Sequence, residues 1–247
     1  EDYSMLTVSW GLTTQSSALV KMLSDVVDGK GPSDVDTVAK LQALADAVKA
    51  VMGYSTRGIG APSVAQINSL LAGQTVEVSP GEFKTVEVTD DALAAVQNKI
   101  LANNTDSNGA IASQSELLGI VKGAMDAYTT SLARIIKFAQ FQLPDPDGFP
   151  TLADYANVGV GGVSESNRSA LNNALATDAV DGTAVSTPAR LQKVIDAYNA
   201  ILTEANGPER PDATPDNPTK QQYAAIGTNF GSIISDSELA LLNDAVG

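Results

Sequence analysis

Apolar residues recur at intervals of three and four positions in three long stretches of this 247-residue chain. That spacing puts them on one face of an α-helix, so the sequence predicts long helices within 32–52, 113–132 and 186–202. The residues predicted to face a core are Leu41, Leu44, Ala45, Val48 and Met52 in the first; Leu118, Val121, Met125, Tyr128 and Leu132 in the second; and Leu191, Val194, Ile195, Tyr198 and Leu202 in the third.

Helix-start signals precede two of these stretches. Ser113 and Glu116 have the spacing of a capping box, in which the two side chains bond reciprocally to backbone N–H groups. Ser186 or Thr187 can cap the third helix, and Pro188 suits a first-turn position because its missing N–H is not needed there. These signals support helices that begin where the apolar pattern begins.

The segment 75–88 breaks the helical pattern, because apolar and polar residues alternate there around Pro80-Gly81. Alternation with a period of two, on both sides of a turn dipeptide, predicts a β-hairpin inserted between helices. Since a lone hairpin is marginal in water, we expect it to pack on a helix face. The predicted fold class is therefore mainly α, with helical-hairpin repeats and one small inserted β-hairpin.

A second pattern is a repeat. The stretches that begin at Pro150 and Pro218 both read Pro-Thr-x-x-x-Tyr-Ala-x-x-Gly, and a third Tyr-x-x-x-Gly begins at Tyr54. Each is followed by a short apolar helix that carries an asparagine, and the glycine allows the chain to turn. The tyrosines and asparagines concerned are Tyr54, Tyr155 and Tyr223, and Asn68, Asn172 and Asn243.

The repeat and two proline-rich stretches predict the organisation of the chain. We expect a helical domain over 1–141, with two repeat-like helix pairs and the hairpin, and a helical repeat module over 150–247. An acidic, proline-rich linker over 142–149 separates them, and a proline-rich spacer over 207–219 precedes a half repeat. Such proline-rich stretches are extended and fairly stiff, so they separate modules while limiting their motion.

Composition narrows the classes of function. Hydrophobic residues make up 43% and aromatic residues 5%, which suits packed helices. A net charge of −14 repels nucleic acid and anionic bilayers, and is explained either by solubility or by a preference for cations.

The chain has no cysteine and no histidine, so it lacks disulfides and the commonest general base. No apolar run approaches the ~20 residues of a membrane span. We therefore expect no enzymatic activity, no nucleic-acid partner and no membrane insertion.

The acidic loops offer the candidate chemistry. Asp145, Asp147 and Asp154 surround Gly148 in a pattern that shares part of the spacing of a calcium loop, so calcium is the one candidate cofactor. An acidic turn in a proline-rich spacer explains the same residues. A second acidic segment, from Asp25 to Asp36, is either a metal site or a set of helix caps and turns.

The repeated asparagines and tyrosines have two interpretations as well. The asparagines either line a ligand groove or form side-chain to backbone bonds that hold a loop against a helix. The tyrosines either contact a ligand or pack in a core with a hydrogen-bonded hydroxyl. Trp10 is either a sugar-stacking residue or a core residue.

The stretch from Pro150 to Leu202 resembles the helical repeat modules of large secreted or cell-surface proteins of Gram-negative bacteria, of the adhesin or RTX-like kind. Residues 218–247 match its first half, and residues 1–141 match more loosely. The resemblance implies a non-enzymatic structural or adhesive segment of an extracellular or surface protein. Its partners would be neighbouring domains of a longer polypeptide and a host or matrix surface. The alternative is a soluble module that binds a glycan or peptide.

Overall fold

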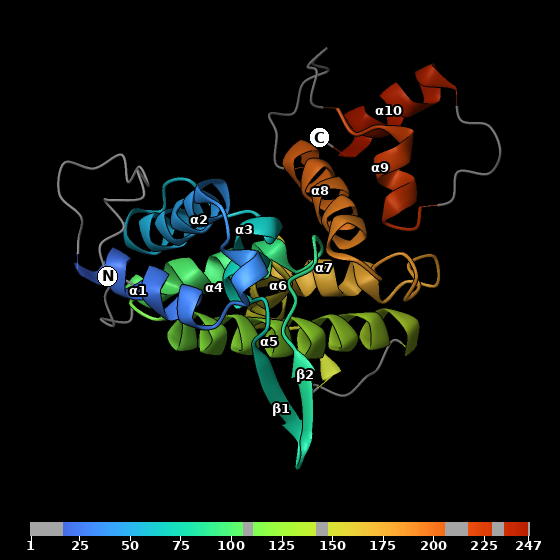
Figure 1. Ribbon diagram of the computed structural model, residues 1–247. Coiled ribbons are helices and arrows are strands. Elements are labelled where there is room, and N and C mark those ends of the chain that lie inside the picture. Colours follow the sequence, from blue (N-terminus) through green and yellow to red (C-terminus); the bar gives the residue numbers. More distant parts are fainter. Residues whose placement is uncertain (1–16, 106–110, 142–147, 206–216, 229–234, 247) are drawn as a thin grey trace. The chain divides into compact units, whose positions relative to one another are not determined.

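A computed structural model describes residues 17–105, 111–141, 148–205, 217–228 and 235–246. Within these ranges the chain is mainly helical, with ten α-helices and one two-stranded antiparallel sheet, so the predicted mainly α class with a small hairpin is confirmed (Figure 1). The helices are α1 (Ser17–Asp28), α2 (Val38–Arg57), α3 (Val64–Leu71), α4 (Leu93–Thr105), α5 (Gln114–Phe141), α6 (Leu152–Val158), α7 (Arg168–Leu175), α8 (Pro188–Ala205), α9 (Lys220–Ala225) and α10 (Asp236–Val246), with a short 3₁₀ helix η2 (Pro32–Asp34).

The three long predicted helices correspond to α2, α5 and α8, and the last two begin at the predicted signals. The N-cap hydroxyl of Thr187 accepts from the backbone N–H of Arg190 at 3.3 Å, one turn into α8, which starts at Pro188. The hydroxyl of Ser113 accepts the N–H of Glu116 at 3.2 Å. The Glu116 carboxylate accepts the N–H of Ala112 at 2.9 Å. The cap before α5 therefore forms, but Glu116 accepts the N–H of Ala112 and not the N–H of Ser113 that a capping box predicts.

The chain divides into two compact units, residues 1–126 and 127–247. The core of the first unit gathers apolar side chains of α1, α2, α3, α4 and the first half of α5. The core of the second gathers those of α6, α7, α8 and the second half of α5. Fully buried examples are Val48, Ile67 and Leu117 in the first unit and Ile135, Leu171 and Ile195 in the second.

The division differs from the linker predicted at 142–149, because it falls inside α5. Val121 and Ala124 pack in the first core, while Ile135, Phe138 and Ala139 pack in the second. One continuous helix thus contributes to both cores. Residues 142–147 of the predicted linker, and 207–216 of the predicted spacer, lie outside the described residues.

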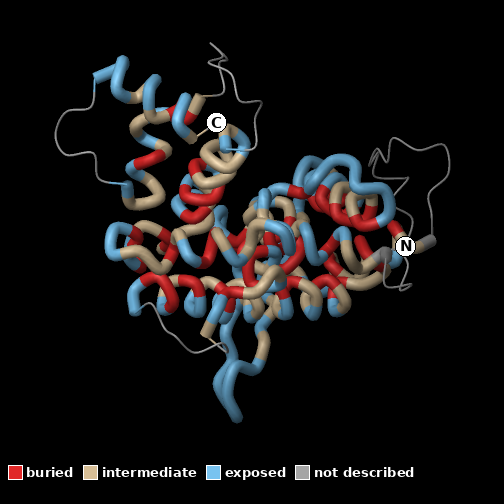
Figure 2. Tube along the Cα trace, turned by 180° about the vertical axis from the view of Figure 1, so that it is seen from behind, coloured by how far each residue is buried: buried red, intermediate tan, exposed pale blue. Residues whose placement is uncertain are grey.

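The hairpin forms where it was predicted, from β1 (Thr75–Ser79) and β2 (Glu82–Thr85), with Thr75 paired to Thr85. The expectation that it packs on a helix face is wrong, because every residue of the two strands is exposed except the half-buried Val76 (Figure 2). It is held at its base instead, where Val88 is 1% exposed in the first core.

The exposed middle of α5 carries a glycine whose replacement by alanine should stabilise the protein. At Gly123 an added methyl group meets nothing within 4 Å, so Gly123→Ala should raise stability by about 0.5–1 kcal/mol by reducing the freedom of the unfolded chain. Gly159 is the control, because its φ of 82° strains any other residue, and Gly159→Ala should lower stability. Urea unfolding followed by circular dichroism measures both, and a loss of stability in Gly123→Ala would contradict the account.

Candidate functional site

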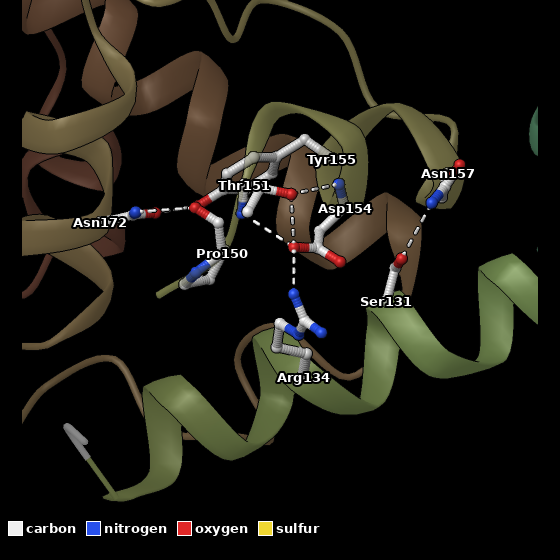
Figure 3. A network of polar contacts seen from close by, with 8 residues as sticks. All are labelled: Ser131, Arg134, Pro150, Thr151, Asp154, Tyr155, Asn157 and Asn172. Carbon is white, nitrogen blue, oxygen red and sulfur yellow. Dashed lines mark hydrogen bonds and ion pairs between the residues drawn. The ribbon is translucent and has the colours of Figure 1, made fainter. Parts of the chain in front are cut away.

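A buried tyrosine and a buried asparagine join α6 to α7 in the second unit (Figure 3). The Tyr155 hydroxyl donates to Oδ1 of Asn172 at 2.6 Å, and Nδ2 of Asn172 donates to the carbonyl oxygen of Pro150 at 3.0 Å. Tyr155 is 1% exposed, and burial raises the pKa of its hydroxyl, which keeps it protonated as a donor. We call this arrangement of tyrosine, asparagine and proline carbonyl the Tyr–Asn lock.

The same lock joins α9 to α10. The Tyr223 hydroxyl donates to Oδ1 of Asn243 at 2.8 Å, and Nδ2 of Asn243 donates to the carbonyl oxygen of Pro218 at 3.1 Å. Tyr223 and Asn243 are both buried. The predicted alternative in which these asparagines hold a loop against a helix, and the tyrosines pack with bonded hydroxyls, is therefore confirmed for both pairs.

Asn68 makes a related contact in the first unit, with a different partner. Its Nδ2 donates to the carbonyl oxygen of Val88 at 2.9 Å, and its Oδ1 accepts the N–H of Val88 at 2.8 Å. Pro150 and Pro218 have no N–H to donate to the asparagine Oδ1. In the Tyr–Asn lock, a tyrosine hydroxyl donates to this oxygen instead. Asn68 therefore binds a residue that follows it in the chain, whereas Asn172 and Asn243 bind prolines that precede them.

Capping boxes fix the start of the tyrosine-bearing helices. The Thr151 hydroxyl accepts the N–H of Asp154, and the Asp154 carboxylate accepts the N–H of Thr151 at 2.8 Å. Thr219 and Gln222 form the same pair of bonds before α9. Thr-x-x-Asp and Thr-x-x-Gln are sequence signals for such a box. The capping threonine therefore explains why Thr follows Pro in both copies, and this role was not assigned from the sequence.

Asp154 also connects α6 to α5 (Figure 3). Its Oδ2 lies 3.2 Å from Nη1 of Arg134, and the neighbouring Asn157 donates to the buried hydroxyl of Ser131 at 3.2 Å. Burial by itself raises the pKa of Asp154, but hydrogen bonds from Thr151 and Ser131 and the charge of Arg134 outweigh it, so the pKa lies below its ordinary value of 3.8. The carboxylate is therefore held ionised.

The lowered pKa of Asp154 predicts a pH-dependent contribution to stability. A carboxylate with a lowered folded-state pKa stabilises the fold above the unfolded value, near 3.8, and this contribution is lost as the pH falls through the folded-state pKa. Asp154→Asn should keep the cap, as the neutral Gln222 does, but cost about 1 kcal/mol at pH 7 and progressively less below pH 3.8.

Urea midpoints of the two proteins at several pH values between 7 and 2 measure this difference. The other acidic residues titrate alike in both proteins, so the difference between them isolates Asp154. A difference that stays constant over this range would show that the charge of Asp154 does not stabilise the fold.

Of the predicted calcium ligands, Asp145 and Asp147 lie outside the described residues, and Asp154 lies in the capping box. Its Oδ2 accepts from the hydroxyl of Thr151 at 2.7 Å and from Arg134, so calcium would have to compete with a guanidinium there. Within the described ranges, no group of three or more acidic side chains is placed to hold a metal ion. Calcium binding stays a prediction.

The second acidic segment makes local contacts. Asp25 pairs with Lys21 at 3.1 Å and Asp36 with Lys40 at 2.8 Å, each one helical turn apart in sequence. Asp34 accepts the N–H of Gly31 at 3.1 Å across η2. These contacts agree with the interpretation as helix and turn stabilisation.

The shallow pockets on the described surface include one in each unit. The pocket of the first unit has a volume of about 350 Å³ and contains Lys30, whose ammonium donates to the carbonyl oxygens of Ser69 at 2.7 Å and Ala72 at 3.0 Å. Burial lowers the pKa of Lys30, against the opposing effect of Asp34. The pocket of the second unit, of about 460 Å³, opens beside the Tyr–Asn lock of α9 and α10, near Thr219.

Comparisons with models of protein families, with curated proteins and with solved structures produced no match for this chain. Among the helices of the described ranges, none has the length and hydropathy needed to cross a bilayer. A functional proposal therefore has to be supported by the contacts within the chain and by the sequence patterns.

Proposed function

We propose that this chain is a non-enzymatic structural and adhesive segment of a bacterial extracellular or cell-surface protein, built from repeated helical modules. The observation that carries the proposal is the recurrence of the Tyr–Asn lock with its capping box. Pro150 with Thr151, and Pro218 with Thr219, begin the two copies, and the same atoms make the same bonds in each.

The proposed mechanism is mechanical. In each copy the polar groups of the lock bond to one another inside the protein, which fixes the angle between two short helices. A buried network with all its partners present gives a single well-defined geometry, which a spacer module needs if many copies are to set a distance. The neighbouring modules of a longer polypeptide are the first proposed partners, and a host or matrix surface is the second.

Labelling of intact cells tests the proposed location. Antibodies raised against the purified chain should label intact cells of the bacterium that encodes it, and an antibody to a cytoplasmic protein of the same cells serves as the control. Labelling that appears only after the cells are lysed would contradict the proposal. Binding of the purified chain to immobilised matrix proteins then tests the adhesive part separately.

A second candidate, a module that binds a glycan or peptide, is favoured by the pocket of the first unit. Ser33, Asp34, Lys30 and Lys40 line it, and such polar groups can orient a sugar or a peptide backbone. Binding on a glycan or peptide array that is lost in Lys40→Ala would support this candidate. An array that shows no binding by the unaltered chain would exclude the glycans and peptides it carries.

A further inference from the structure

The two helix pairs that share the Tyr–Asn lock differ in how well their apolar side chains are covered. When α6–α7 and α9–α10 are aligned on the lock, three apolar positions are at most 1% exposed in the first pair and only half-buried in the second. The neighbouring Leu241 of α10 is 69% exposed. The aligned positions are Val158, Leu171 and Leu175 in the first pair, and Ile226, Leu242 and Val246 in the second.

In the first pair the cover is supplied by α8 together with the second half of α5. Leu191, Val194 and Ile195 of α8 belong to the same buried cluster as Val158, Leu171 and Leu175. The long helix that follows the first pair is therefore part of what covers it. The same helix also contacts α9 and α10, where the three aligned side chains stay half-buried.

Polar side chains of α8 add specificity to this packing. Gln192 accepts the N–H of Gly161 at 2.9 Å and donates to its carbonyl oxygen at 3.2 Å. Asn199 donates to the carbonyl oxygen of Gly162 at 2.9 Å. Both glycines lie in the loop between α6 and α7, so α8 recognises the backbone of the pair as well as its apolar surface.

The features of α8 recur in α2 of the first unit, so they define a type of helix. Both helices have a threonine N-cap, and a basic residue stands three positions after the cap. This basic side chain donates to the carbonyl oxygen of the residue seven positions before its own: Lys40 to Ser33 at 2.6 Å, and Arg190 to Thr183 at 2.8 Å. A Leu-Gln pair follows in each helix. The glutamine bonds to an aspartate four residues on, Gln42 to Asp46 at 2.9 Å and Gln192 to Asp196 at 2.7 Å.

We propose that the half-buried apolar face of α9–α10 is a docking surface for a further helix of the α8 type, carried by a neighbouring segment of a longer polypeptide. The inference rests on the modular part of the proposed function and not on the proposed location. The occupant is a helix with a threonine cap, a Leu-Gln pair and an apolar stripe, because α8, which has these features, packs with α5 over the equivalent face of α6–α7.

An extended chain tests this proposal. When the two locks are aligned, Gly247 corresponds to Ala176. A copy of residues 177–205 is therefore added after Gly247, so that a second α8 follows α10 in the same way that α8 follows α7. Hydrogen exchange of the α10 amides should slow by about tenfold, because the added helix removes three half-buried side chains from water. The matched control is the same extension with the copies of Leu191, Val194 and Ile195 changed to serine. Equal exchange in the two extended chains would overturn the proposal.

A variant of the docking surface distinguishes the other occupants. Val246→Ser, at the last residue of α10, should leave the exchange of the unextended chain nearly unchanged and abolish the gain from the extension. If instead the unextended chain sediments as a dimer that Val246→Ser dissociates, a second copy covers the face and the proposal is wrong. Neither result depends on cell labelling, so failure here is separable from failure of the proposed location.

Discussion

Phe138→Ala should destabilise the second unit by about 3–5 kcal/mol, because it removes a large buried side chain and a core relaxes only partially around the cavity that is left. Phe138 is 1% exposed, and its ring meets that of Phe149 edge-on, with centroids 5.4 Å apart. Hydrogen exchange of the α6 and α8 amides measures the effect within the unit. That readout is needed because a two-unit chain need not unfold in one transition.

Phe141→Ala is the matched control for this prediction. Phe141 lies three residues further along the same helix and is 58% exposed, so the same chemical change should alter stability by less than about 0.5 kcal/mol. Equal effects of the two substitutions would show that the second half of α5 does not pack in the core as described.

Asn172→Ala should destabilise the second unit by about 2–4 kcal/mol, because it leaves two buried polar groups without partners at once. The Tyr155 hydroxyl loses its acceptor and the Pro150 carbonyl loses its donor, and each unsatisfied buried group costs about 1–3 kcal/mol. The exposed neighbour Asn173 provides the control, and Asn173→Ala should have little effect. Urea unfolding combined with hydrogen exchange of the α6 and α7 amides measures both.

A double-mutant cycle separates the two bonds of this lock. Tyr155→Phe removes only the hydroxyl, so it should cost less than Asn172→Ala, and the two losses should not add. Additive losses would show that the hydroxyl and the amide stabilise the fold independently. The corresponding substitution Asn243→Ala should cost less, because Leu242 and Val246 beside it are only half-buried.

Much of the fold follows from local pattern. The apolar spacing located α2, α5 and α8, the alternation around Gly81 located the hairpin, and Ser186 or Thr187 marked the start of α8, where Thr187 is the cap. These features depend on residues within a few positions of one another, where helix period, strand period and capping act directly. The recurrence of Tyr and Asn in the sequence also identified the residues of the lock, though not which of them bond to each other.

The pairings in the site could not be read from the chain alone. Asn172 reaches Pro150 across 22 residues, whereas Asn68 reaches forward across 20 residues to Val88. The two asparagines stand in similar short helices, so the direction of the contact depends on which segment the tertiary fold brings alongside. Arg134 beside Asp154 is a further example, because neither residue has a local reason to select the other.

What the sequence determined by itself is the long helices, the hairpin and the residues that repeat, since period, caps and turn glycines act over short distances. Only the tertiary structure decided how α5 divides between two cores, which backbone carbonyl each asparagine binds, and which apolar face is left half-covered. Those outcomes depend on competition among distant surfaces for the same apolar and polar partners, and that competition is resolved only when the whole unit is packed.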